Sequence, residues 1–207
     1  MAPTGACEAV LVREAEPEKF MAAFATAVAG EGDVFLGNPA WTDDELVRAR
    51  QLMGMSSAAK ADRGWLMIPT GGSSGQMKFA RHDGHTIAAA VRGFARHFDL
   101  PQVNAVGVLP LYHVSGLMAW MRCVLTGGTY RAWTGKQLEA GDWPEVTADR
   151  PWVISLVPTQ LDRLQRSGAA LERLRQFRII FLGGAPAWPE LLERAAEARL
   201  PLSLSYG

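Results

Sequence analysis

The stretch from Trp65 to Lys78 has the residue types that could bind an anion. An apolar, strand-like run feeds a turn rich in glycine and hydroxyl side chains, and a single lysine closes it. Glycine lets the backbone approach a ligand closely, and successive backbone N–H groups can then form a concave anion-binding nest. Ser73 and Ser74 add hydroxyl donors, and Lys78 adds a mobile positive charge. The stretch is predicted to be a phosphate-binding loop; the alternative is a flexible Gly-Ser surface linker.

Three further loops follow predicted strands and have unusual residues: 110–116, 183–186 and 205–207. In open α/β sheets, ligands bind beyond the carboxyl ends of the strands. Loops of this kind after four separate strands are much less likely to occur by chance than any one of them. The first loop lacks the Gly-Lys-Ser/Thr of the common nucleotide loop, and it lacks the glycine pattern of dinucleotide-binding proteins.

Strands that alternate with helices must position these loops. Apolar residues that recur every three or four positions, together with capping residues, predict the helices. They are expected at 17–30, 42–53 and 83–98, from the 110–116 loop to residue 126, within 135–150, and at 158–166 and 189–199. Strands are expected at 34–36, 65–69, 79–81, 104–109, 130–133, 152–157, 178–182 and 202–205. Because most strands are apolar throughout, we expect an α/β fold of layered, mostly parallel sheets with flanking helices.

Two regions are less clearly patterned. Residues 1–16 carry little periodicity. Residues 135–150 are polar and contain Gly, Asp and Pro, so they are expected to form a surface excursion. A boundary near residue 150 is compatible with this composition, although the two sides are not expected to be independent domains.

Composition excludes several classes of protein. The chain has 207 residues, 48% of them hydrophobic, which is enough for a substantial core. Lys+Arg and Asp+Glu both number 21, so the chain lacks the basic field that a nucleic-acid or membrane-surface binder needs. Its two cysteines, Cys7 and Cys123, have no metal-type spacing, so neither a zinc site nor a disulfide framework is expected.

The location expected from the sequence is the cytoplasm. The first residues show no basic region followed by an apolar block, as a secretory signal would. The longest candidate for a membrane helix, residues 104–128, is interrupted by His113 and Arg122, so no membrane insertion is expected.

Four motifs together resemble the adenylate-forming acyl-CoA synthetase (AMP-binding) superfamily. Thr-Gly-Gly-Ser-Ser-Gly-Gln-Met-Lys at 70–78 resembles its phosphate loop, and Pro-Leu-Tyr-His at 110–113 resembles the motif whose aromatic-His pair lies at the acyl pocket. Phe-Leu-Gly-Gly-Ala-Pro at 181–186 resembles its adenine-side loop, and Ser-Tyr-Gly at 205–207 resembles the start of its Tyr-Gly-x-Thr-Glu motif. The motifs occur in the family's order, from about residue 65 to the end.

The resemblance implies a two-step reaction. A carboxylate attacks the α-phosphate of ATP, pyrophosphate leaves, and the thiol of coenzyme A captures the acyl-adenylate. The implied partners are a small-molecule carboxylic acid, ATP and coenzyme A, with Mg²⁺ bridging the phosphates; a homodimer is compatible with the family. Tyr-His-Val-Ser-Gly at 112–116 and Ser-Leu-Val-Pro-Thr-Gln at 155–160, with the short region before the phosphate loop, are similar to the o-succinylbenzoate–CoA ligases of menaquinone or phylloquinone synthesis.

The resemblance also implies roles for individual residues. Lys78 and His113 are the implied catalytic residues. The implied ATP-binding residues are Thr70, Gly71, Gly72, Ser73, Ser74, Gly75, Lys78, Gly183, Gly184, Ala185, Pro186, Tyr206 and Gly207. The implied acid-binding residues are His113, Ser115, Gly116 and Gln160. No metal ligand is assigned, because the family's Mg²⁺-linked Glu is not in this sequence.

Each assignment has a structural alternative. His113 by itself is more often a structural histidine, and Ser115 is a common type at a helix start. Gln160 would be a solvated helix residue, Gly183 part of a plain turn, and Tyr206 a packing residue.

The sequence also departs from the family pattern. Gly71 replaces a hydroxyl residue and Met77 replaces a proline. The Thr-Glu of the last motif is not present. We therefore expect residues 1–207 to be a partial N-terminal adenylation domain that lacks its C-terminal domain and is inactive alone. The alternatives are a synthetase for another carboxylic acid and a non-catalytic nucleotide-binding module.

Overall fold

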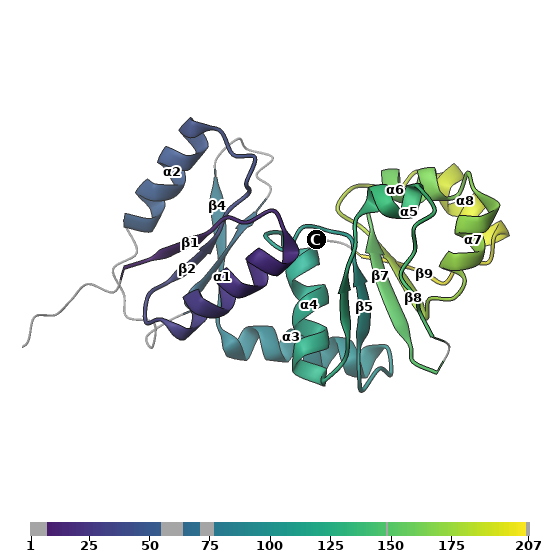
Figure 1. Ribbon diagram of the computed structural model, residues 1–207, viewed down its shortest axis with the longest axis horizontal. Coiled ribbons are helices and arrows are strands. Elements are labelled where there is room, and N and C mark those ends of the chain that lie inside the picture. Colours follow the sequence, from purple (N-terminus) through teal and green to yellow (C-terminus); the bar gives the residue numbers. More distant parts are fainter. Residues whose placement is uncertain (1–7, 55–63, 71–76, 148, 206–207) are drawn as a thin grey trace, which may run out of the picture. The chain divides into compact units, whose positions relative to one another are not determined.

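The computed structural model describes residues 8–54, 64–70, 77–147 and 149–205 (Figure 1). The chain divides into two compact units. The first comprises Met1–Ala89 and Pro110–Val114, and the second comprises Ala90–Leu109 and Ser115–Gly207. Each unit is built on its own sheet, with β1 to β4 in the first and β5 to β9 in the second.

The first unit has a four-stranded sheet in the order β1-β2-β3-β4, in which β4 alone runs antiparallel to its neighbour. Phe20 on α1 is fully buried and its ring stacks on Phe24 at 6.0 Å, so the apolar stripe of α1 forms part of the core. The elements are β1 (Val10–Val12), α1 (Pro17–Ala29), β2 (Val34–Leu36), α2 (Asp43–Gly54), β3 (Leu66–Thr70) and β4 (Lys78–His82).

The second unit has a five-stranded, fully parallel sheet in the order β6-β5-β7-β8-β9. Because all strands run the same way, the loops that follow them leave from one edge of the sheet. Its strands are β5 (Asn104–Gly107), β6 (Tyr130–Ala132), β7 (Trp152–Leu156), β8 (Ile179–Leu182) and β9 (Leu202–Leu204). The helices after β4 are α3 (Gly84–His97), α4 (Val114–Thr126), α5 (Gly135–Glu139), α6 (Pro158–Leu164), α7 (Gly168–Leu174) and α8 (Pro189–Glu197). The first residues of α3, up to Ala89, and the first residue of α4 belong to the first unit.

Helices cover both faces of this second sheet. Successive strand residues point to opposite faces, and β7 shows the result. Ile154 packs with buried side chains of α5, α6, α7 and α8, whereas Val153 packs with Ala119 and Cys123 of α4. Both faces of β7 are thus buried, which explains why its sequence is apolar throughout.

Local capping signals are confirmed at two helix starts. At α2, the Thr42 backbone N–H donates to Glu45 Oε2 at 2.8 Å and the Glu45 N–H donates to Thr42 Oγ1 at 3.3 Å, a reciprocal capping box. At α3, the Thr86 N–H donates to Asp83 Oδ1 at 2.7 Å. These bonds satisfy N–H groups that a helix start leaves without intrahelical acceptors.

The predicted α/β class with mostly parallel sheets is confirmed, because β3–β4 is the one antiparallel pair in the described ranges. Three details differ. β1 and α7 lie where no element was expected. A boundary near residue 150 is wrong, because β7 begins at Trp152 and pairs with β5 in the middle of the second sheet.

Candidate functional site

The two ends of the predicted phosphate loop lie opposite each other on β3 and β4. Thr70 pairs with Lys78 in the antiparallel register, and the Thr70 hydroxyl donates to the Lys78 carbonyl oxygen at 3.4 Å. Lys78 is exposed. The predicted donors between them, Gly71, Gly72, Ser73, Ser74 and Gly75, lie outside the described residues, so their role stays a prediction.

Phe79 anchors the strand that carries Lys78. Its ring meets Phe35 of β2 edge-on at 5.0 Å and Trp41 at 6.3 Å. Neighbouring strand residues point to opposite faces, so the packing of Phe79 leaves the Lys78 ammonium free to face solvent or a ligand.

His113 stands at the end of a turn that leads into α4. The His113 N–H donates to the Pro110 carbonyl at 3.1 Å, and the Tyr112 and His113 ring centroids are 4.7 Å apart. Desolvation lowers the pKa of the His113 imidazole and raises the pKa of the Tyr112 hydroxyl, so both are neutral near pH 7. Of the residues in the first turn of α4, Ser115 is exposed and Gly116 is buried.

The loops after β7, β8 and β9 contact one another at one edge of the second sheet. The Gly183 N–H donates to the Leu156 carbonyl at 3.2 Å, and the Ser205 N–H donates to the Leu182 carbonyl at 2.9 Å. Gly184 has a φ of +79°, which favours glycine. Gly184, Ala185 and Pro186 are exposed, so a ligand can reach them. Tyr206 and Gly207 lie outside the described residues.

Gln160 caps α6 and is not simply a solvated helix residue. Its Oε1 accepts the Val157 N–H at 3.0 Å, and the residue is half-buried. Its side-chain amide also packs against Gly135, where a Cβ would lie 2.8 Å from Nε2. The capping bond occupies an oxygen that an acid-binding role would otherwise leave available.

Arg122 is a candidate ligand residue that the sequence prediction missed. Its guanidinium lies over the Phe94 ring at 4.0 Å, and among the described residues no hydrogen bond or ion pair to it is found. Burial lowers the pKa of Arg122 to about 10, which still leaves it charged at neutral pH. Arg122 is half-buried, with its Nε buried and without a hydrogen-bond partner, so an anionic ligand would stabilise it. The interruption of the apolar stretch 104–128 was its only signal.

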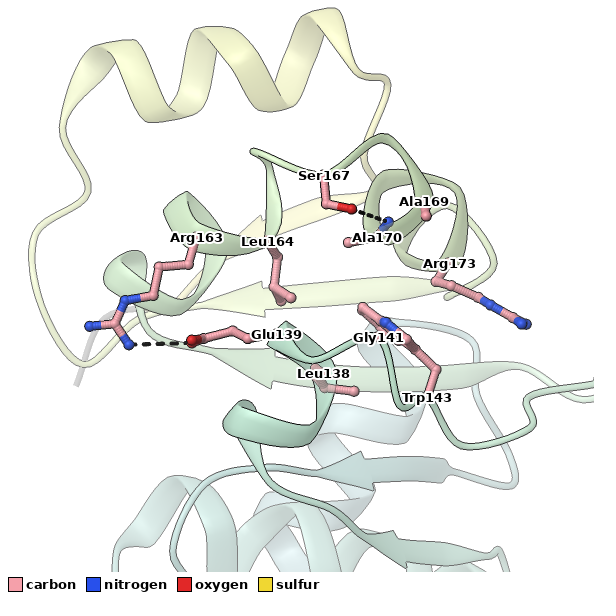
Figure 2. A pocket seen from close by; sticks show the side chains of 10 residues that line it. All are labelled: Leu138, Glu139, Gly141, Trp143, Arg163, Leu164, Ser167, Ala169, Ala170 and Arg173. Carbon is pink, nitrogen blue, oxygen red and sulfur yellow. Dashed lines mark hydrogen bonds and ion pairs between the residues drawn. The ribbon is translucent and has the colours of Figure 1, made fainter.

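A pocket of about 430 Å³ lies elsewhere in the second unit, between α5, α6 and α7 (Figure 2). Leu138, Leu164 and Trp143 contribute its apolar surface, and Arg163 at one end is paired with Glu139 at 3.3 Å. None of the described residues predicted to bind ATP or the acid lines this pocket. It is therefore separate from the candidate site.

Within the described ranges, no group of three or more His, Cys, Asp or Glu side chains is placed to ligate a metal ion. None of the helices in these ranges combines the length and apolar composition that a bilayer crossing requires.

Comparison with known proteins decides the family. The family model described as AMP-binding enzyme matches residues 6–207. The chain belongs to the AMP-binding enzyme family. The resemblance carried by the four motifs is thereby confirmed.

Individual members of the AMP-binding family are similar over part of their length. The 2-succinylbenzoate–CoA ligase of Staphylococcus epidermidis is 32% identical over 140 residues, 67% of this chain and 29% of that protein. Wild-type E. coli MenE, solved with an analogue of OSB-AMS, is 24% identical with a TM-score of 0.71, covering 98% of this chain and 50% of that chain. The inhibitor-bound N-terminal domain of FACL13 from Mycobacterium tuberculosis is 17% identical with a TM-score of 0.72, covering 96% and 62%. The chain thus spans about half the length of the E. coli protein.

Proposed function

We propose that the chain is the ATP-facing part of an acid–thiol ligase that acts on 2-succinylbenzoate. The likeness to the S. epidermidis protein of that name, 32% identical over 140 residues, carries the proposal. Residues 1–207 would form part of an N-terminal adenylation domain, with a C-terminal domain elsewhere in the full-length protein. The enzyme would work in the cytoplasm, and a homodimer is its proposed assembly.

The proposed reaction has two balanced steps. A substrate carboxylate oxygen attacks the α-phosphorus of ATP, and the bond to the β-phosphate breaks so that pyrophosphate leaves with the electron pair. The sulfur of coenzyme A then attacks the acyl carbon, loses its proton, and displaces AMP to leave a thioester. Charge that develops on the leaving pyrophosphate needs fixed donors and cations.

Lys78 is the proposed cation for the polyphosphate. Its register opposite Thr70 puts it at the exit of the loop whose glycines and serines would donate N–H and O–H groups. This donor set fits a triphosphate. Mg²⁺ bound with ATP would neutralise phosphate charge.

The acid is proposed to bind at His113, and Arg122 is a separate candidate for binding a carboxylate. A neutral His113 imidazole can donate its ring N–H to a substrate carboxylate. The guanidinium of Arg122 lacks a counter-ion among the described residues and matches a carboxylate in geometry and charge. Because 2-succinylbenzoate has two carboxylates, one can react while the other binds a cation.

The test uses the full-length protein with ATP, Mg²⁺ and coenzyme A. We expect pyrophosphate release and a coenzyme A thioester with 2-succinylbenzoate, at a kcat/KM at least about tenfold above that for benzoate, which lacks the second carboxylate. A higher kcat/KM for a fatty acid would reject the substrate and leave a synthetase for another acid.

A non-catalytic nucleotide-binding module is the second candidate. Gly71 and Met77 favour it, because they replace a hydroxyl donor and a proline in the family pattern. ATP binding without pyrophosphate release, for every acid tried with the full-length protein, would support this alternative.

A further inference from the structure

Gly183 and Ser205 lie against each other beyond the carboxyl ends of β8 and β9. The Ser205 backbone N–H donates to the Leu182 carbonyl at 2.9 Å, and the Ser205 hydroxyl donates to the same oxygen at 3.4 Å. A Cβ placed on Gly183 would overlap the Ser205 hydroxyl and would lie 2.7 Å from the Ser205 carbonyl oxygen. The hydroxyl can rotate away. The carbonyl belongs to the main chain, so a larger residue at 183 would have to displace the backbone at Ser205, directly after β9.

The need for glycine differs between neighbouring positions. Gly184 has a positive φ, so its backbone conformation favours glycine. Gly183 has no such φ, and its missing side chain serves to make space for Ser205. Gly168, at the start of α7, has nothing within 4 Å of a built Cβ, so its substitution meets no neighbour.

The contact joins two loops that the proposed function assigns to the nucleoside of ATP. Gly183 is followed by the exposed Gly184, Ala185 and Pro186, and Ser205 is followed in the sequence by Tyr206. Both loops follow the carboxyl ends of parallel strands. The distance between the carboxyl ends of β8 and β9 therefore sets the width of any site between the two loops.

We infer that the contact between Gly183 and Ser205 fixes the spacing of these two loops, and that Ser205 is a positioning residue for the nucleoside end of ATP. The inference rests on the proposed function. The polyphosphate end would be held by the loop that ends at Lys78, which is a separate segment of the chain. A change at the Gly183–Ser205 contact should therefore weaken binding of the nucleoside while sparing binding of the phosphates.

Isothermal titration of the full-length protein with ATP and with inorganic tripolyphosphate, both with Mg²⁺, separates the two ends. For Gly183→Ala we expect the Kd for ATP to rise by about tenfold or more. The Kd for tripolyphosphate should stay within about twofold, because that ligand has no nucleoside. Ser205→Ala, which removes only a long hydrogen bond, should raise the Kd for ATP by about twofold to fivefold.

Two control variants isolate the effect. Gly168→Ala should leave both dissociation constants unchanged. Gly128→Ala would clash with the Val103 carbonyl, which lies at the amino ends of the strands of the same sheet. It should therefore lower the melting temperature but keep the ratio of the Kd for ATP to the Kd for tripolyphosphate.

Three results would contradict either the inference or the proposed function. An ATP Kd within about twofold of wild type in Gly183→Ala, or an equal loss for both ligands, would overturn the inference. If Gly183→Ala fails to fold, an unchanged ATP Kd in Ser205→Ala overturns it instead. Failure of the wild-type protein to bind ATP would reject the proposed function itself.

Discussion

Thr70 and Lys78 are cross-strand partners on β3 and β4, with the Thr70 hydroxyl 3.4 Å from the Lys78 carbonyl oxygen. Side chains of directly opposed residues in an antiparallel pair stand about 5 Å apart at Cβ. The Gly-Ser segment between them therefore begins and ends at one place.

Lys78→Ala should weaken ATP binding and slow pyrophosphate release. Loss of a charge-assisted contact to phosphate costs about 1.5–3 kcal/mol, which corresponds to a reduction of about tenfold to a hundredfold. The measurement is kcat/KM for ATP in the full-length protein. The control is Lys136→Ala, which removes an exposed lysine from α5 and should change nothing. Equal effects of the two substitutions would show that the loss reflects net charge and not the loop.

His113 should make the folded state less stable in mild acid. Desolvation lowers its pKa in the folded protein below the usual value of about 6.5, which the unfolded chain retains. Between the two values the unfolded state binds more protons, so stability is lost as the pH falls below about 6.5. Because the side chain is exposed, the loss is small. His113→Gln should remove it, as measured by urea unfolding at about pH 5 and 7.5. An NMR titration that places the His113 pKa above 6.5 would contradict this account.

The capping residues and apolar runs were sufficient to predict most of the fold. Thr42, Asp83 and Pro158 begin helices as expected, since their signals are local. β1 was not predicted, because it lies in a stretch with little periodicity and its partner, β2, lies more than 20 residues away. The same limit applies to the division into two sheets, which depends on pairing between distant strands.

The candidate site was predictable only where a motif marked it. Gly184 and Lys78 belong to motifs, and the structure places them at the ends of strands. Arg122 belongs to none. Its significance comes from the aromatic ring beneath it and from the lack of a described counter-ion, and both depend on how α4 packs against α3 and β8.

Asn104 should contribute more to the stability of the fold than to catalysis. Its side chain is fully buried at the start of β5, where Oδ1 accepts the Thr129 N–H at 2.9 Å and Nδ2 donates to the Pro151 carbonyl at 3.4 Å. Asn104→Ala removes both bonds and leaves a small void, so we expect a loss of about 2–3 kcal/mol in the free energy of unfolding.

Gln102→Ala is the matched control for this substitution. Gln102 also bonds across to a neighbouring loop, at the Gly127 carbonyl, but its side chain is exposed and water can replace the bond. Its loss should be below about 1 kcal/mol in the same urea titration. A comparable loss in both variants would mean that burial does not set the cost at Asn104.

Arg122→Met should separate ligand binding from folding. Methionine retains an apolar contact with Phe94 while it removes a charge whose burial lowers the pKa to about 10. Since an unpaired buried charge is unfavourable, the free energy of unfolding should stay the same or rise. The KM for 2-succinylbenzoate should increase by about tenfold or more, and the KM for ATP should change little.

Arg131→Met is the control for Arg122→Met, and its expected effects on stability and KM are the opposite. Arg131 lies over the Trp152 ring at 5.1 Å and donates to the Glu145 carbonyl, so its guanidinium already has partners within the protein. Its loss should lower stability and leave both KM values unchanged. If Arg122→Met instead lowers stability and leaves the KM for the acid unchanged, then Arg122 is a packing residue. In that case the proposed binding of the acid would depend on His113.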